Sequence, residues 1–130
     1  MKKRALIIAA IATLLTTTHC CHAQSQNKTT TVHFADALKG EVKHQYIMEH
    51  ATLKAESQGC TISGFQVSFV PSGGNLFGPF RNKGNKLTEN QMNFLRKFTE
   101  KKVKIYIEDI TVSCGSDTTH ANHIAITSIP

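Results

Sequence analysis

The sequence predicts a mainly β, single-domain protein with one α-helix, and three observations support this prediction. The 130-residue chain has the length of one domain. Alternation of apolar and polar residues predicts long strands at residues 60–70 and 103–114. Between them, a capping pattern followed by a three-residue apolar step predicts a helix at about residues 89–99. The helix is therefore expected to pack between strands.

The helix prediction depends on a start signal and an apolar stripe. Thr88 and Gln91 form the T-x-x-Q pattern of a capping box, in which each side chain bonds the backbone amide of the other. Apolar residues then recur at helical spacing and define one face. The members of this stripe are Met92, Phe94, Leu95 and Phe98.

The strand at residues 103–114 changes its apolar parity halfway. Val103 and Ile107 belong to one face, whereas Ile110 and Val112 belong to the other parity. Because a one-residue slip exchanges the two faces of a strand, we expect a bulge or bend near Glu108–Asp109.

Three other segments carry weaker patterns. Residues 46–57 fit a helix by propensity, but their parity favours a strand at residues 51–56. Residues 76–81 form a glycine-punctuated loop or hairpin. A turn at residues 115–118 leads into a last strand at residues 121–129, which we expect to pair with the preceding strand as a tight hairpin.

Residues 1–23 have the layout of a cleaved secretory signal peptide, with a basic start and small residues at the cleavage positions. Their apolar run of about 11 residues is shorter than the ~20 needed for a permanent membrane span. A lipid anchor on Cys20 or Cys21 is disfavoured because His19 or Cys20 would precede the modified cysteine. We expect a flexible N-terminal segment at residues 24–45 and the folded domain at residues 46–130.

Cys60 and Cys114 remain as an even pair after the signal peptide is removed. Export to an oxidising compartment predicts a disulfide between them. Closing a loop of about 54 residues gives an upper-side stabilisation of ~4 kcal/mol. No C-x-x-C spacing is present, so a structural bridge is favoured over a redox or metal role.

Charge and motifs argue against several function classes. Removal of residues 1–23 lowers the formal net charge from +6 to +3, which does not argue for a nucleic-acid partner. His120-x-x-His123 is the only metal-like spacing, and it lacks the three or four ligands of a zinc site. No nucleophile elbow or phosphate-binding loop appears. We therefore expect no catalytic residue, metal or cofactor.

Phe77 and Phe80, followed by Arg81, are the candidate partner-binding residues. Two interpretations stay open for the aromatic rings. They cover the end of the core, or they form an exposed contact of the kind in which aromatic residues and arginine are enriched.

Three pieces of the chain, taken in order, resemble a known family. ISGFQVSFV at residues 62–70, GNKLTENQMNFL at residues 84–95 and VKIYIEDI at residues 103–110 are similar to the C-terminal domain of the gliding-motility protein GldM and its relative PorM. The resemblance covers residues 46–129. It implies an immunoglobulin-like β-sandwich with a helix between strands, in periplasmic machinery for type IX secretion and gliding. We expect this chain to lack the long stalk and preceding domains of that family, and Cys60 and Cys114 depart from the pattern, so we do not expect motor function to transfer.

Together these observations predict a secreted or periplasmic, non-catalytic protein-binding module of the bacterial cell envelope, whose partners are other envelope proteins. The oligomeric state is not predicted. Two alternatives stay open. One is a small periplasmic enzyme or inhibitor with a pocket beside His120 and His123, and the other is a lipid-anchored envelope component.

Overall fold

The computed structural model describes residues 30–130, which form a mainly β single domain with two sheets and two helices. The expected signal peptide and the cysteines at positions 20 and 21 lie outside these residues. The elements, in chain order, are β1 (Val32–Phe34), β2 (Lys39–Lys43), α1 (His44–Glu49), β3 (Leu53–Ala55), β4 (Cys60–Pro71), β5 (Phe77–Lys83), α2 (Glu89–Arg96), β6 (Val103–Cys114), β7 (Asp117–His120) and β8 (Ile124–Ile129).

The larger sheet has the strand order β2-β8-β6-β4-β5, and β7 pairs with β6 beside this path. The two longest strands, β4 and β6, run antiparallel from the pair Cys60–Cys114 to the pair Pro71–Val103. Only β2 runs parallel to its neighbour, β8. Strands β2 and β5 therefore form the two edges of this sheet.

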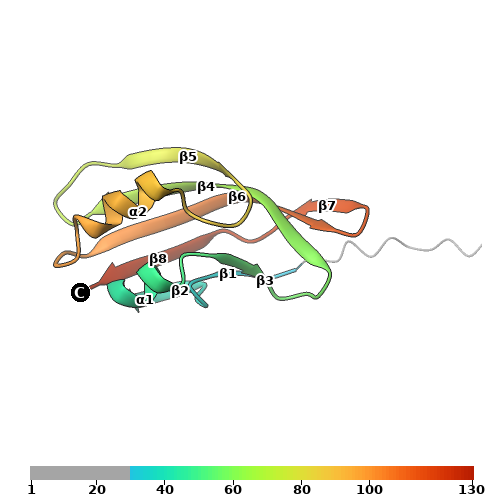
Figure 1. Cartoon of the computed structure of the whole chain (residues 1–130), viewed down its shortest axis with the longest axis horizontal. Helices are drawn as coiled ribbons and strands as arrows, with labels where there is room; N and C mark the ends of the chain where they lie inside the picture. Colours follow the sequence, from blue (N-terminus) through green and yellow to red (C-terminus); the bar gives the residue numbers. More distant parts are fainter. Residues whose placement is uncertain (1–29) are drawn as a thin grey trace, which may run out of the picture.

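A second layer covers one face of the larger sheet. Figure 1 shows α2 beside β4 and β6, while α1 and the small β1–β3 sheet lie beside β2 and β8. Both layers contribute to one apolar core, because their buried residues form a single cluster. Its largest fully buried members are Phe34, Ile47, Leu53, Leu95 and Val32 from the second layer and Phe65, Phe69, Ile105, Ile107, Ile110, Ile124 and Ile126 from the sheet.

The opposite face of the sheet is not covered by the second layer. Its residues alternate with the core residues along each strand, and most are polar. Representative members are Gln66, Arg81, Lys104, Tyr106, Glu108 and Thr127.

The predicted helix and its capping box are confirmed in α2, which begins at Glu89 as expected but ends at Arg96 rather than near residue 99. The Gln91 backbone N–H donates to Thr88 Oγ1 at 3.4 Å, and the Thr88 N–H donates to Gln91 Oε1 at 2.9 Å. Leu95 is fully buried, and the other stripe residues are partly buried against the same core. The local pattern therefore fixed both the start of the helix and its buried face.

The predicted bulge at Glu108–Asp109 is also confirmed. Asp109 has φ 48°, and the β4–β6 register shifts around it. Buried residues change parity there, from Ile107 to Ile110. On the two sides of this bulge, β6 pairs with two different strands. Residues 111–114 of β6 pair with β7, and residues 103–107 pair with β8. The strand expected at residues 121–129 is thus shortened to β8, and β7 precedes it.

The N-terminal part differs from the expectation. Residues 32–45, assigned above to a flexible segment, form β1, β2 and the start of α1, so the expected boundary at residue 46 falls inside a helix. β1 pairs with β3, and β2 pairs with β8 near the C-terminus. Since both pairings join segments that are distant in sequence, local patterns could not reveal them. The expected strand at residues 51–56 does contain β3.

Cys60 and Cys114 lie directly opposite each other at one end of the β4–β6 pair, with their sulfur atoms at bonding distance, 2.05 Å. The predicted disulfide therefore joins the two central strands. Within residues 30–130, no helix has the length and apolar character needed to cross a bilayer.

Candidate functional site

Four partly exposed phenylalanines gather where β5 meets α2, and we call them the aromatic patch: Phe77, Phe80, Phe94 and Phe98. The Phe77 and Phe94 rings stack with centroids 4.0 Å apart, and Phe80 and Phe98 extend this pair at 4.6 and 4.8 Å. Buried Phe69 lies beneath, 5.7 Å from Phe94. The patch is therefore continuous with the core and also reaches the surface.

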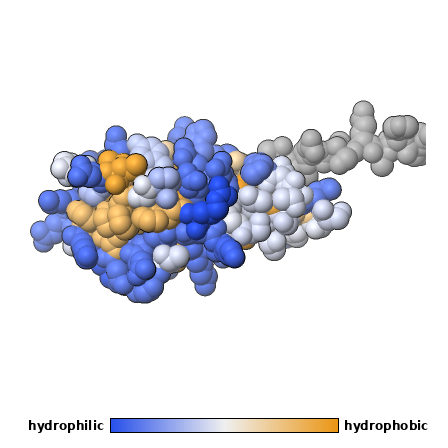
Figure 2. Space-filling model, turned by 90° about the horizontal axis from the view of Figure 1, so that it is seen from above, coloured by the Kyte–Doolittle hydropathy of each residue, from blue (hydrophilic) through white to orange (hydrophobic). Residues whose placement is uncertain are grey.

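The strand and helix place these rings for separate reasons. Phe80 lies opposite Val67 in the β4–β5 register, so it faces the covered side of the sheet. Phe94, near the end of α2, stacks on Phe77 of β5, and Phe98, in the turn after α2, packs against Phe94. Leu76, just before β5, is 57% exposed. Seen from above, an apolar area is bordered by hydrophilic residues (Figure 2).

A buried pair of amides ties the end of β5 to the first turn of α2. Asn82 Nδ2 donates to Gln91 Oε1, and Gln91 Nε2 donates to Asn82 Oδ1, both at 2.7 Å. The two residues are 3% and 4% exposed. Each satisfies the buried polar group of the other. In the sequence only the capping role of Gln91 is visible, so its pairing with Asn82 could not be predicted there.

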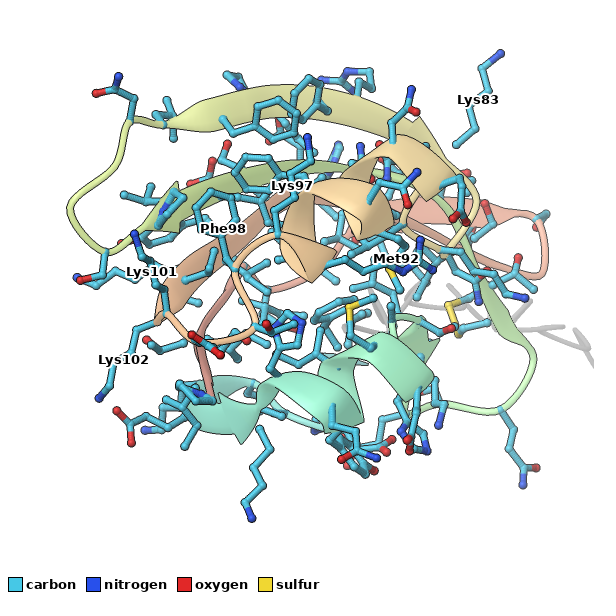
Figure 3. The ribbon with its side chains drawn as sticks, turned by 60° about the vertical axis from the view of Figure 1, so that its left-hand side comes forward. Lys83, Met92, Lys97, Phe98, Lys101 and Lys102 are labelled. Atoms are coloured by element: carbon cyan, nitrogen blue, oxygen red, sulfur yellow. A yellow bond between two sulfur atoms is a disulfide. The ribbon has the colours of Figure 1, made fainter. Side chains whose placement is uncertain are left out.

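Two lysines near the patch, Lys97 and Lys101, have no carboxylate partner among the described residues, and neither has Lys83 on the opposite face of the sheet. By contrast, Lys102 Nζ lies 2.7 Å from Glu41 Oε1. In Figure 3, Lys97 lies next to Phe98 at the end of α2, Lys101 lies in the turn that follows, and Lys83 projects from the end of β5. An apolar surface with an unneutralised positive rim favours a partner that carries acidic residues.

The structure brings together two of the three predicted contact residues. Phe77 and Phe80 both join the patch, but Arg81 lies on the opposite face of the sheet, because consecutive strand residues point to opposite sides. Its Nη2 atom is 3.6 Å from Asp109 Oδ2. Phe94 and Phe98 complete the patch instead. Their i,i+4 spacing was the available signal, although it did not show which strand they would meet.

The histidines of the H-x-x-H spacing occupy an open surface depression. His120 and His123, both exposed, line it together with Glu108 and Asp109. Within residues 30–130, no three histidine, cysteine or acidic side chains are placed to hold a metal ion. The depression is open to solvent, so it does not provide the enclosed environment that strengthens acid–base chemistry.

A cluster of three polar residues joins parts of the second layer. The Tyr46 hydroxyl and Lys54 Nζ donate to the two carboxylate oxygens of Asp36. These hydrogen bonds hold the pKa of Asp36 below its ordinary value and raise the pKa of Tyr46. Because the three residues come from the β1 turn, α1 and β3, the cluster connects the parts of the second layer.

No protein-family model matches the chain, and no curated protein shows significant sequence similarity to it.

Proposed function

We propose that this chain is an exported, non-catalytic protein-binding module of the bacterial cell envelope, and that the aromatic patch is its contact surface. The carrying observation is the gathering of four partly exposed phenylalanines from two elements, with Leu76 exposed beside them. Contiguous exposed apolar surface rimmed by polar residues is typical of interaction sites. Aromatic residues also contribute a large share of the energy at such interfaces.

The proposed location follows from the N-terminal sequence and the cysteine pair. A basic start, a short apolar run and small residues at the cleavage positions favour secretion. The Cys60–Cys114 bridge is compatible with an extracytoplasmic compartment, where disulfides persist.

The resemblance to the GldM and PorM C-terminal domain supports the same class of function. In this proposal, the larger sheet and the β1–β3 sheet correspond to the two sheets of an immunoglobulin-like sandwich, with α2 packed between strands. Only the binding of envelope proteins is transferred, because a shared fold by itself does not determine an activity.

A pull-down from envelope extracts of the native host tests the contact surface. We expect Leu76→Asp and Phe80→Ala each to reduce partner recovery about tenfold, the effect of losing about 1.4 kcal/mol at an interface. Tyr106→Ala is the matched control, since Tyr106 is a partly exposed aromatic residue on the uncovered sheet face. Circular dichroism verifies that each variant is folded. Equal recovery from all three variants and the unmodified chain would reject the patch.

A further inference from the structure

We propose that the partner supplies an extended segment that adds to the free edge of β5 as a further strand. Its apolar side chains would rest on the aromatic patch, and its carboxylates would lie beside Arg81 and Lys83. This inference rests on the proposed function and specifies the chemistry of the partner: an extended stretch in which apolar and acidic residues alternate.

The backbone of β5 has free hydrogen-bonding groups on its outer side. β5 is the last strand in the sheet order and pairs only with β4. The Gly84 N–H donates to the Ser63 carbonyl at 2.9 Å, which marks a hydrogen-bonded pair. Since such pairs alternate along an antiparallel ladder, the N–H and C=O groups of Arg81 and Lys83 point away from β4. These groups form a template for another strand.

The side chains of β5 determine what the added strand must carry. A strand next to β5 continues the pleat of the sheet, so its alternate residues lie beside Phe80 on one face and beside Arg81 and Lys83 on the other. On the first face they meet the aromatic patch. On the second they meet Arg81, which already lies 3.6 Å from Asp109 Oδ2, and Lys83, which forms no ion pair within residues 30–130 and therefore favours an opposite-charge neighbour most. Unpaired Lys97 and Lys101 add positive charge near the patch.

A lipid surface fits these observations less well than a peptide does. Phenylalanines and lysines together also suit an anionic membrane. However, burying this edge in lipid would leave the outward backbone groups of Arg81 and Lys83 without partners, and each unsatisfied group costs several kcal/mol. An added strand satisfies the same groups and buries the same rings. Pro79, which has no N–H to donate, limits the pairing to the part of β5 that follows it.

Hydrogen exchange of the full-length chain tests the inference directly. The probe is a blocked peptide, Asp-Val-Asp-Leu-Asp-Val-Asp, and its control has lysine in place of each aspartate. We expect the aspartate peptide at about 1 mM to slow exchange of the Arg81 and Lys83 amides at least about tenfold. The amides of β2, the other edge, should exchange as before. No slowing at Arg81 and Lys83 would overturn the inference.

Two variants of Arg81 separate the contribution of its backbone N–H to peptide binding from that of its side chain. Arg81→Pro removes the outward N–H, whereas Arg81→Ala removes only the side chain and its contact with Asp109. We expect Arg81→Pro to weaken peptide binding about tenfold relative to Arg81→Ala. If Arg81→Pro does not fold, the exchange measurement on the unmodified chain still decides the question.

The outcomes distinguish this inference from the proposed function. One outcome is that Arg81→Pro and Arg81→Ala recover the native partner equally, whereas Phe80→Ala does not recover it. Strand addition is then wrong, and the aromatic patch remains the contact surface. If Phe80→Ala also keeps the partner, the proposed function itself fails. Binding to phosphatidylglycerol vesicles that depends on Phe80, without peptide-induced protection, would replace the inference with lipid docking.

Discussion

The two edge strands of the larger sheet present different surfaces. β2 has the sequence KGEVK, and four of its five residues are exposed. Its Glu41 forms an ion pair with Lys102. β5 has the sequence FGPFRNK, in which Phe77 and Phe80 join two further rings from α2 and the turn that follows it. One edge is thus dominated by charge, whereas the other combines free backbone groups with an apolar surface.

This difference shows how one sheet can discourage strand addition at one edge and allow it at the other. Charged side chains on an edge strand discourage pairing with other chains, because pairing would bring their charges into the ladder. β2 fits that description. On β5, only Pro79, Arg81 and Lys83 discourage pairing with another strand. The two cations favour acidic partners and do not exclude every partner. The apolar surface at the β5 edge requires that α2 hold the Phe94 ring against Phe77.

The largest effect is expected from Leu95→Ala, because Leu95 is the fully buried anchor of α2. The truncation should lower the free energy of unfolding by about 2–5 kcal/mol, through lost burial and the cavity left behind. Urea denaturation measures this change. Arg96→Ala, at the exposed neighbouring position, is the control and should change stability by less than about 1 kcal/mol. Equal effects of the two variants would contradict the packing of α2 described here.

Removal of the disulfide should lower stability at both edges together. The bridge joins β4 and β6, which lie between β2 and β5. Cys60→Ser combined with Cys114→Ser should cost about 2–4 kcal/mol of unfolding free energy, because the unfolded chain gains conformational freedom. Thermal unfolding with reductant provides the control, since the unmodified chain should then approach the variant. An unchanged melting temperature on reduction would show that the bridge does not contribute.

Gln91→Ala should loosen the β5 edge alone. It leaves Asn82 Oδ1 without its donor and Asn82 Nδ2 with only the Lys86 carbonyl, and it removes the capping bond from the Thr88 N–H. The expected cost is about 1–3 kcal/mol. Hydrogen exchange should become faster along β5 and α2 and stay unchanged along β2. The double variant Asn82→Val with Gln91→Met removes both polar groups, and it should recover part of the loss. If the double variant is less stable than Gln91→Ala, the amide pair does not have the assigned role.

The smallest effect is a pH dependence confined to the β2 side. His44 follows β2, is 5% exposed and lies 3.1 Å from Ser128 Oγ through Nδ1. Burial lowers the pKa of His44 from its ordinary value of 6.5, so folding favours the neutral ring. This contribution to stability is complete above pH 6.5 and is lost as the pH falls toward the lowered pKa.

Denaturation at about pH 7.5 and pH 5 measures this dependence, because the range includes the titration of histidine. His44→Leu, which does not titrate, should show a smaller difference between the two conditions than the unmodified chain. If the two proteins lose equal stability on acidification, His44 is not the group responsible.

Some features of the candidate site could be predicted from the sequence, and others could not. Phe77 and Phe80 stood out because they lie in a glycine-punctuated stretch, and Phe94 and Phe98 stood out as a helical pair. Their meeting needed the fold, since it depends on α2 lying over β5. The position of Arg81 could have been predicted from strand parity alone, because it directly follows Phe80.

The sequence by itself determined the elements whose interactions are local: α2 with its capping box, the long strands β4 and β6, and the bulge at Asp109. Each of these depends on residues a few positions apart, whose spacing is visible in the chain. Only the tertiary structure decided the pairing of β2 with β8, the fold of residues 32–45 and the assembly of the aromatic patch. These depend on contacts between segments distant in sequence, where burial against a particular neighbour outweighs local preference.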